Sequence, residues 1–398
     1  MTGSTPTVAI IFERLGPYHV ARLKAVAQLF PVHVIEVVQR DDTYAWSEIE
    51  ELPIPRTTLF GSATRPHGQQ LRRVMAQSLD RIRADAVAVP GWSADYAVAA
   101  LAWCADKGVP AVLMSDSTAY DAPRVAWKEA VKRRLVNLCQ AALVAGKRHI
   151  DYVRALGMVR GRIHVGYDVV DNEHFMHGAR VARENAPAVR RRLGLSEYYF
   201  LASARFVPKK NLLRLLEAFS LYRRQAGVPV WDLVLLGDGE LRGQLEQSVR
   251  ALDLQNVVHM PGFKQYDELP DYYGLASAFV HASTVEQWGL VVNEAMAAGL
   301  PVLVSECCGC VPDLVEEGRN GFTFDPCDMD ALAALMNRIS SDACDLRAMG
   351  RASQEIIARW TPKTFAEGLC SAVTAASAAP RPKLGWGNRL LLSTLLLR

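Results

Sequence analysis

The sequence predicts an α/β protein built from two doubly wound, Rossmann-like domains, and three observations support this fold class. The chain has 398 residues, half of them apolar, which is too long for one ordinary hydrophobic core. Strand-like apolar runs alternate with helical segments in both halves, beginning at residues 8–12 and again at 198–204. Residues 172–192 are rich in Arg, Ala and Asn and lack strand character, as expected of an interdomain linker followed by a helix. We therefore expect a first domain over residues 1–175 and a second over residues 185–362.

The first domain opens with strands at residues 8–12 and 32–37, joined by a turn and a helix over about 20–29. Gly16 lies in that turn. It either permits a ligand to approach the loop closely or is an ordinary turn glycine. The pattern weakens over residues 41–83, where Pro and Gly mark loops.

Three further strands are expected in this domain, at residues 86–89, 110–114 and 142–145. The second of them runs into Ser115 and Asp116. Polar side chains at the carboxyl end of a parallel strand usually project toward the substrate, so Asp116 is a candidate catalytic residue.

The second domain repeats this plan with a strand at residues 198–204, a basic loop, and a helix over 212–222. Arg205 and Lys210 lie in the loop at the sheet edge, where two cations suit a diphosphate group, although exposed basic residues are common at helix starts. The next strand, at 231–236, ends in a Gly-x-Gly turn at Gly237, which alone is a weak indication of nucleotide binding.

A strand, loop, helix and strand over residues 276–304 form the unit around which the domain is organised. The backbone amides of Gly289, Leu290 and Val291 start its helix, and a helix start attracts anions. Glu286 precedes these amides and Glu294 follows them. If residues 288–294 are helical, the two acids lie on the order of 10 Å apart. Carboxylates at that spacing suit the two hydroxyl-rich ends of a nucleotide sugar, and the alternative is that each is an ordinary surface charge.

The frame Glu-Gln-Trp-Gly-Leu-Val-Val-Asn-Glu, from Glu286 to Glu294, resembles the E-x7-E signature of family 4 retaining glycosyltransferases, which have the GT-B fold. This resemblance implies two domains facing across a cleft, with a terminal helix at about 363–398 that returns to the first domain. Arg205 and Lys210 match the R-x4-K diphosphate clamp of that family.

The resemblance also implies roles for other residues. Glu286 would bind the donor sugar and Glu294 the ribose. Gly237 would lie beside the nucleotide and Phe263 beside the base. The loop of Gly16 would approach the transferred sugar or the acceptor.

At Asp116 the chain departs from the family, because many relatives place a His there. No metal or other cofactor is expected. The pair Asp328 and Asp330 has the spacing of a metal site but suits the start of a helix better.

The resemblance implies transfer of a sugar from a UDP-, GDP- or ADP-sugar to an acceptor hydroxyl with retention of configuration. No protein nucleophile is evident, so departure and attack on the same face are expected. Two alternatives remain open: a sugar-nucleotide epimerase with the same fold, and a non-catalytic subunit that binds a sugar nucleotide.

Composition and charge limit the partners and the location. A net charge of +3 indicates no general affinity for nucleic acid. The polar residues 1–7 leave no room for a signal peptide, and no apolar run reaches the ~18–20 residues that span a bilayer, so a cytoplasmic location is expected. The eight cysteines lack zinc spacing, and Cys307, Cys308 and Cys310 suit packing better than a metal site.

Residues 124–135 form a basic amphipathic segment with Trp127, and residues 381–398 combine four basic residues with Trp386 and several leucines. Both segments suit the surface of an anionic membrane, which predicts a lipid-linked or envelope glycan as acceptor. The alternatives are a solvated face for the first segment and docking on the first domain for the second.

Overall fold

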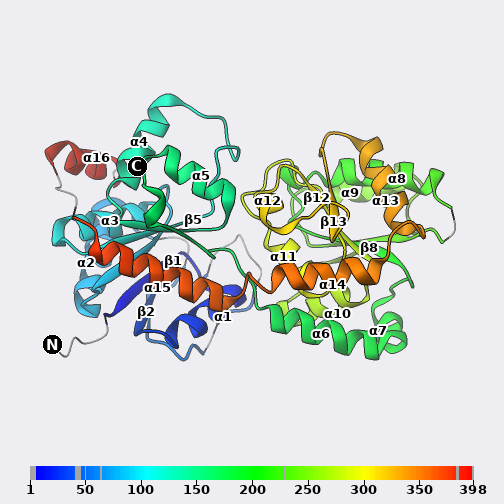
Figure 1. The fold of residues 1–398 in the computed structure, drawn as a ribbon, viewed down its shortest axis with the longest axis horizontal. Coiled ribbons are helices and arrows are strands. Elements are labelled where there is room, and N and C mark those ends of the chain that lie inside the picture. The colour runs from blue at the N-terminus through cyan, green and yellow to red at the C-terminus, as the bar shows by residue number, and fades with distance from the viewer. Residues whose placement is uncertain are drawn as a thin grey trace. The chain divides into compact units, whose positions relative to one another are not determined.

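The computed structural model describes residues 6–40, 46–49, 51–62, 65–227, 229–381 and 385–396. These residues form two compact units, coloured along the chain in Figure 1. Unit 1 comprises Met1–Val169 and Pro362–Arg398, and unit 2 comprises Val170–Thr361. The division falls at residue 169, ahead of the expected boundary at 175, because the helix that begins at Asn172 packs in unit 2.

Unit 1 contains one parallel sheet of seven strands in the order β3-β2-β1-β4-β5-β6-β7. The strands are β1 Val8–Phe12, β2 Val32–Val38, β3 Arg56–Phe60, β4 Ala86–Pro90, β5 Ala111–Ser115, β6 Ala141–Val144 and β7 Ile163–Val165. The strand order reverses between β1 and β4, which pair in parallel with Val8 opposite Ala86. Such a reversal is where ligands bind in open α/β sheets.

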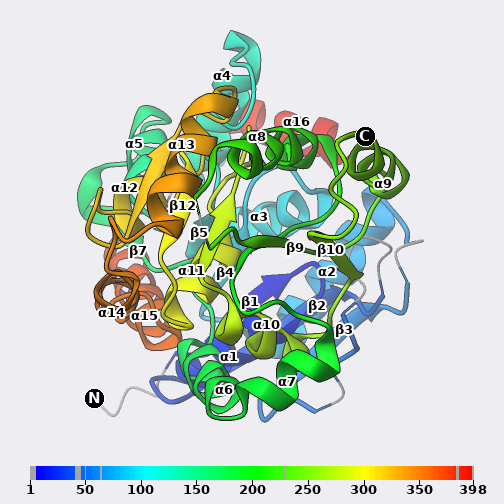
Figure 2. The ribbon, with the colours of Figure 1, turned by 90° about the vertical axis from the view of Figure 1, so that its right-hand side faces the viewer.

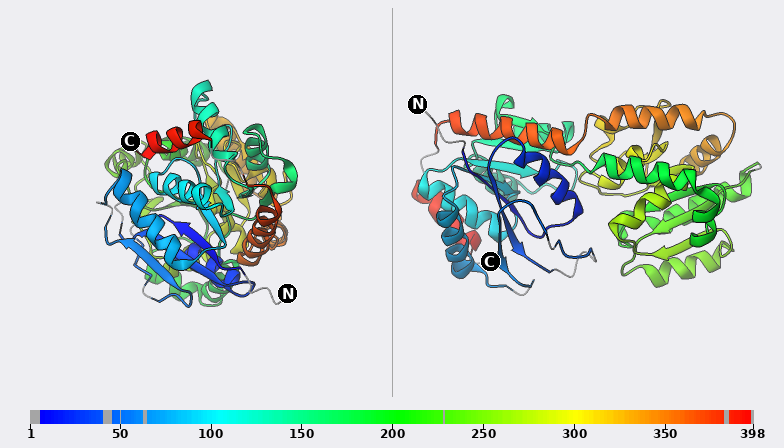
Figure 3. Two further views of the ribbon diagram at one scale, coloured as in Figure 1. Left: turned by 90° about the vertical axis from the view of Figure 1, so that its left-hand side faces the viewer. Right: turned by 90° about the horizontal axis from the view of Figure 1, so that it is seen from below.

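Helices cover both faces of this sheet. They are α1 Pro17–Ala27, α2 Gly68–Ile82, α3 Asp95–Lys107, α4 Ala126–Val136, α5 Lys147–Ala155, α15 Pro362–Ala378 and α16 Trp386–Leu396, with a 3-10 turn η1 Arg160–Arg162. Helix α15 packs on α1 and mainly on strands β6 and β7, and α16 packs on α3 (Figure 3). The terminal segment belongs to unit 1, as expected, and forms two helices there instead of one.

The described part of residues 41–83 contains more regular structure than the sequence pattern predicted, namely β3 and α2. Leu71, Met75 and Leu79 recur every four residues along α2 and are fully buried. This stripe is the spacing of an amphipathic helix, and it outweighs the nearby Pro and Gly residues.

Unit 2 has a six-stranded parallel sheet in the order β10-β9-β8-β11-β12-β13. The strands are β8 Tyr199–Ser203, β9 Asp232–Leu236, β10 Val258–Gly262, β11 Ala278–His281, β12 Val302–Ser305 and β13 Gly321–Phe324. Here the order reverses between β8 and β11, which are paired neighbours. The loops that follow these two strands therefore start side by side.

The helices of unit 2 also cover both faces. They are α6 Asn172–Glu184, α7 Ala186–Leu193, α8 Leu212–Gln225, α9 Arg242–Ala251, α10 Leu269–Leu275, α11 Leu290–Ala297, α12 Val311–Leu314, α13 Met329–Ser340 and α14 Leu346–Ile357, with 3-10 turns η2 Pro208–Lys210 and η3 Tyr266–Glu268. Figure 2 shows α8 and α13 on one side of the sheet and α6 and α10 on the other. The Asp328 carboxylate accepts a hydrogen bond from the Ala331 amide at 2.9 Å, which confirms that it caps α13.

No helix among the described residues is both long enough and apolar enough to cross a membrane.

Candidate functional site

The carboxyl edge of the unit 2 sheet is a set of loops that hydrogen-bond to one another. The Thr284 amide, in the loop after β11, donates to the Lys209 carbonyl after β8 at 2.9 Å. The Phe206 amide after β8 donates to the Asp238 carbonyl after β9 at 2.8 Å. These bonds make one continuous surface from loops that are far apart in the sequence.

Gly237 is required by this packing. It adopts a φ of 128°, and a Cβ atom at this position would lie 1.8 Å from the Ala204 carbonyl oxygen. Its amide also donates to the Gly262 carbonyl at 3.1 Å. The Gly-x-Gly turn is therefore explained by close backbone packing, whatever its role toward a nucleotide.

Glu286 and Lys210 form an ion pair in which both side chains are 13% exposed. Lys210 ends the turn η2, and Glu286 lies in the loop after β11. The same Glu286 oxygen, Oε2, lies 3.0 Å from Nε2 of His281 and 3.2 Å from Oγ of Ser283. The structure thus brings one predicted cation and one predicted carboxylate into direct contact.

Burial alone would raise the pKa of Glu286, but the hydrogen bond with His281 and the charge of Lys210 outweigh it and hold that pKa well below its usual value. Burial lowers the pKa of His281, and the hydrogen bond to Glu286 opposes that effect. At neutral pH Glu286 is therefore an ionised carboxylate and His281 a neutral imidazole.

Helix α11 begins at Leu290, two residues later than the start at 288 used to place the acids. Gly289 is its N-cap, with a φ of 110°, so the amides of Gly289, Leu290 and Val291 lie where a helix provides no carbonyl partners of its own. The Trp288 indole donates to the Asn293 side chain at 2.9 Å and fixes this turn. The chain therefore presents a helix start directly after Glu286.

Glu294 lies inside α11 and is 1% exposed. It accepts a hydrogen bond of 2.6 Å from the hydroxyl of Tyr273, which lies on α10. Burial, together with the Glu294 charge, raises the pKa of Tyr273, which remains a hydrogen-bond donor at neutral pH. The second acid of the signature is thus built into the protein interior, unlike Glu286.

Arg205 and Phe263 follow the same sheet edge. Arg205 comes two residues after β8 and is exposed, and Phe263 comes directly after β10 and is half-buried. In the sheet, β10 lies two strands from β8. Phe263, which was predicted to lie beside the base, therefore starts further along the edge than the loop of Arg205 and Lys210.

The candidate residues of unit 1 lie at the equivalent edge of its own sheet. Gly16 caps α1 with a φ of −138°, which any residue can adopt, and a Cβ atom added there would meet nothing closer than Nδ1 of His19, at 3.8 Å. The fold therefore does not require glycine here. Asp116 directly follows β5 and is half-buried, and its charge adds to burial in raising the pKa of Tyr167.

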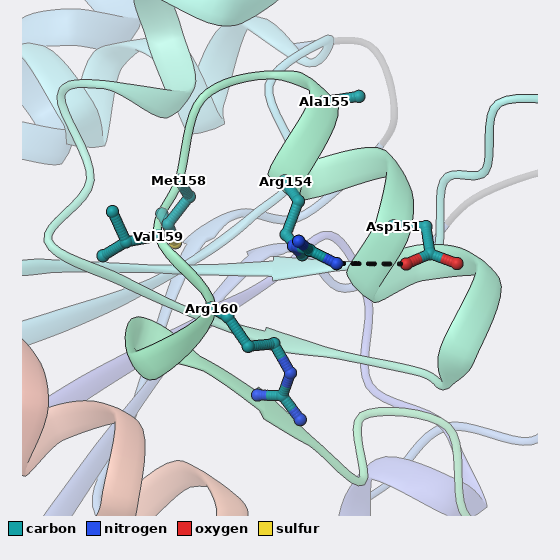
Figure 4. Close-up of a pocket in the computed structure, with 6 residues that line it drawn as sticks. All are labelled: Asp151, Arg154, Ala155, Met158, Val159 and Arg160. Atoms are coloured by element: carbon teal, nitrogen blue, oxygen red, sulfur yellow. Dashed lines mark ion pairs between the residues drawn. The ribbon is translucent and has the colours of Figure 1, made fainter.

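A separate hollow of about 540 Å³ opens at the end of α5 in unit 1 (Figure 4). Its lining consists of Asp151, Arg154, Ala155, Met158, Val159 and Arg160. Asp151 and Arg154 pair at 3.8 Å, and Arg160 donates to the Ile163 carbonyl at 2.7 Å. None of the predicted site residues lines this hollow.

His281, Ser283 and Tyr273 were not among the predicted site residues. A signal for the first two was present, since both are polar residues at the carboxyl end of a buried strand. Nothing in the sequence pairs Tyr273 with Glu294, because the contact depends on how α10 and α11 both pack on α6. The described residues contain no cluster of three or more metal-ligating side chains, and Cys308 and Cys310 are fully buried.

One known protein family matches part of this chain. The family described as "Glycosyl transferases group 1" matches residues 187–356. This match covers most of unit 2.

Two relatives match this chain over part of their length. The chain is 33% identical over 152 residues to the amylovoran biosynthesis glycosyltransferase AmsK of Erwinia amylovora, which is 37% of each chain. It is 30% identical over 143 residues to the alpha-monoglucosyldiacylglycerol synthase of Acholeplasma laidlawii, or 35% of each chain. The matched segments thus span little more than a third of these relatives.

Solved structures extend the likeness to the whole chain at the level of the fold. HepE of Anabaena, solved in complex with UDP, aligns with a TM-score of 0.73 over 93% of this chain and 99% of its own, at 19% identity. WaaG, described as a glycosyltransferase involved in lipopolysaccharide biosynthesis, aligns with a TM-score of 0.66 over 92% of this chain and 99% of its own, at 15% identity. The GT-B fold expected of both units is confirmed.

Proposed function

We propose that this chain is a retaining glycosyltransferase that moves a sugar from a nucleoside diphosphate sugar to an acceptor hydroxyl. The observation that carries the proposal is the contact between Lys210 and Glu286 beside the N-terminus of α11. A cation, a carboxylate and a helix start at one sheet edge are the groups needed to bind a diphosphate and a sugar at adjacent positions.

The leaving diphosphate would interact with Lys210, with Arg205 and with the amides at the start of α11. Negative charge grows on the phosphate oxygen as its bond to the sugar breaks, and fixed cations and amides stabilise that charge. Glu286 would accept hydrogen bonds from the sugar hydroxyls, and Glu294 would serve the ribose. Because Glu294 is 1% exposed and bonded to Tyr273, this last role requires its carboxylate to become accessible to the ribose.

The transfer would proceed on one face of the sugar. The bond from the anomeric carbon to the diphosphate oxygen breaks, the acceptor oxygen forms a new bond to the same carbon, and a phosphate oxygen takes the acceptor proton. In this mechanism the protein needs no nucleophile of its own, and its contribution is positioning and electrostatic stabilisation. We assign the acceptor side to unit 1, with Gly16 and Asp116.

We propose a lipid-linked or envelope glycan as the acceptor. AmsK, WaaG and the alpha-monoglucosyldiacylglycerol synthase are named for the synthesis of amylovoran, lipopolysaccharide and a glycolipid, respectively. These names support this class of acceptor. Unit 1 also exposes large apolar side chains: Trp127 is 55%, Tyr120 74% and Trp386 82% exposed. Exposed aromatic residues beside basic ones suit the interface of an anionic membrane.

The central experiment measures release of free nucleoside diphosphate from a panel of UDP-, GDP- and ADP-sugars, with and without a lipid-extract acceptor. We expect release from one donor only when acceptor is present. An epimerase would convert the sugar without any acceptor, and a binding subunit would release nothing. Failure of all donors to raise the melting temperature would contradict the proposal as a whole.

A flotation assay with anionic vesicles tests the membrane part separately. Lys132 bonds to Glu129 and to Tyr152, each at 2.9 Å, so neutralising it would disturb unit 1 itself. The informative variant instead replaces the exposed Trp127 and Trp386 by Ser. Binding of the wild type that is lost in this variant supports the assignment, and unchanged binding contradicts it.

A further inference from the structure

All hydrogen bonds to the side chain of Glu286 meet at one of its two oxygens. Oε2 contacts the ammonium of Lys210, Nε2 of His281 at 3.0 Å and Oγ of Ser283 at 3.2 Å. Within the described residues, Oε1 receives no hydrogen bond. A carboxylate in water has no reason to favour one oxygen, so the protein imposes this asymmetry.

His281 is placed to act as a fixed donor. It is the last residue of β11, its side chain is 3% exposed, and a Cβ atom on Gly289 would lie 3.7 Å from its Nε2. Because Oε2 is an ionised acceptor, Nε2 carries the hydrogen. A backbone strand and a closely packed helix start thus hold a neutral imidazole against the carboxylate.

We propose that His281 is a positioning residue for Glu286, fixing Oε2 so that Oε1 is the oxygen presented to the donor sugar. This inference rests on the proposed function and adds to it the means by which the sugar-binding carboxylate is oriented. It does not require His281 to touch the substrate.

The need for such a donor follows from the chemistry of Lys210. A bound diphosphate would compete with Glu286 for the same ammonium, and the carboxylate would then lose its charged partner in part. The terminal torsion of a Glu side chain has broad minima, so a carboxylate held by one flexible cation would turn easily. His281 and Ser283 remain as donors when Lys210 turns to the phosphates, and Oε1 keeps its direction.

The test uses two substitutions that differ in where they place an amide. His281→Gln puts its NH₂ group near the position of Nε2 and can still donate to Glu286. His281→Asn puts its NH₂ group near Nδ1 and cannot reach Oε2. The two variants are matched in polarity and both remove the imidazole. Ser283→Ala, which removes a second donor to the same oxygen, is measured beside them.

The readout is the pair of dissociation constants for a nucleoside diphosphate and for its sugar conjugate, using UDP with UDP-glucose, GDP with GDP-mannose, and ADP with ADP-glucose. For His281→Asn we expect sugar-conjugate binding to weaken about tenfold, the effect of one charge-assisted hydrogen bond, with the free diphosphate within twofold of wild type. His281→Gln should stay close to wild type in both. Ser283→Ala should weaken sugar-conjugate binding in the same direction but less.

A control in the same sheet is His259, which bonds to Asp232 at 3.0 Å on the edge strand β10. His259→Asn should leave the ratio of the two constants unchanged. The proposal is overturned if the Asn and Gln variants of His281 have the same ratio, or if both ligands weaken together. Should neither variant of His281 fold, an unchanged ratio in Ser283→Ala overturns it. A wild-type protein that binds no sugar conjugate would instead contradict the proposed function.

Discussion

The carboxyl edges of the two sheets are built in different ways. In unit 2, loops from different strands bond to each other, and Lys210 from one loop pairs with Glu286 from another. In unit 1, two helix starts are each closed within their own loop. The Gly16 amide donates to Nδ1 of His19 at 3.0 Å, and the Gly146 amide donates to Nδ1 of His149 at 3.1 Å.

This difference teaches where a substitution should be felt. A change at the edge of unit 2 alters contacts shared by several loops, so both binding and stability should respond. A change at either of these two helix starts in unit 1 breaks a bond inside one loop, so its effect on folding should stay local.

The largest effect is expected for Glu286→Gln. The amide keeps the shape of the side chain but removes the charge that pairs with Lys210 and turns one acceptor into a donor. We expect kcat/KM for sugar transfer to fall by about 10²–10³-fold, as for other lost positioning contacts. Glu306→Gln is the matched control, because Glu306 is exposed in the loop after the next strand, β12. Equal activity in the two variants would contradict the site.

Lys210→Ala should lower transfer about 100-fold, because the growing charge on the leaving group loses a fixed cation. It should also lower the melting temperature at pH 7. The pKa of Glu286 is depressed in the folded protein, so its stabilising contribution is present above the unfolded value of 4.5 and is lost as the pH falls. The melting temperatures of variant and wild type should therefore converge toward pH 3.

Lys209→Ala is the control for this prediction, since Lys209 lies in the same turn and contacts the next loop through its backbone carbonyl. If Lys209→Ala loses as much activity as Lys210→Ala, the loop contributes positive charge in general, and the specific position of Lys210 is not required.

Gly237→Ala tests the shared packing at the edge of unit 2. The added methyl group meets the Ala204 carbonyl, and the φ of 128° is unfavourable for any other residue, so we expect a loss of about 3–5 kcal/mol in unfolding free energy. Gly243→Ala, with open space around it inside helix α9, should be neutral or stabilising.

Gly16→Ala is the counterpart in unit 1. Its backbone conformation is ordinary and its surroundings are open, so the melting temperature should change little. A loss of transfer activity without a loss of stability would indicate that a ligand approaches this loop closely. Denaturant unfolding and transfer assays on both glycine variants separate the two cases.

Most of the fold could be predicted from the sequence, because buried parallel strands appear as apolar runs and the loops carry the glycines. Arg205, Lys210 and Glu286 could be predicted as candidates for the same reason, because each lies in a loop that follows such a run. Glu294, inside α11, could be predicted only from its spacing to Glu286. The strand β3 and the helix α2 within residues 41–83 were not predicted. Nearby Pro and Gly residues obscured the stripe of Leu71, Met75 and Leu79 that is buried in α2.

The roles of the contact residues could not be predicted. His281 acquires its partner only when the loop after β11 folds back, and Tyr273 only when α10 and α11 both pack on α6. Similarly, Gly237 is explained by the carbonyl of Ala204, which lies in the loop after a different strand. Such long-range contacts depend on strand order, which spacing along the sequence does not specify.

A further effect at the edge of unit 1 is expected from the titration of His19. Burial, and next the nearby charge of Arg22, lower its pKa from 6.5 to about 3. Between these values the unfolded chain binds more protons than the folded one, so stability falls as the pH drops below 6.5. Because the ring is partly exposed, we expect a loss of about 1–2 kcal/mol between pH 7.5 and pH 5.

His19→Asn isolates this contribution, because the Asn side-chain oxygen can accept the Gly16 hydrogen bond from the position of Nδ1 without titrating. Other buried histidines titrate equally in both proteins and cancel in the difference. The gap in unfolding free energy between variant and wild type should therefore move in favour of the variant as the pH falls to 5. If the two proteins lose stability in parallel as the pH falls, the acid sensitivity comes from other residues. The pKa of His19 is then lowered less than its place in this loop of unit 1 indicates.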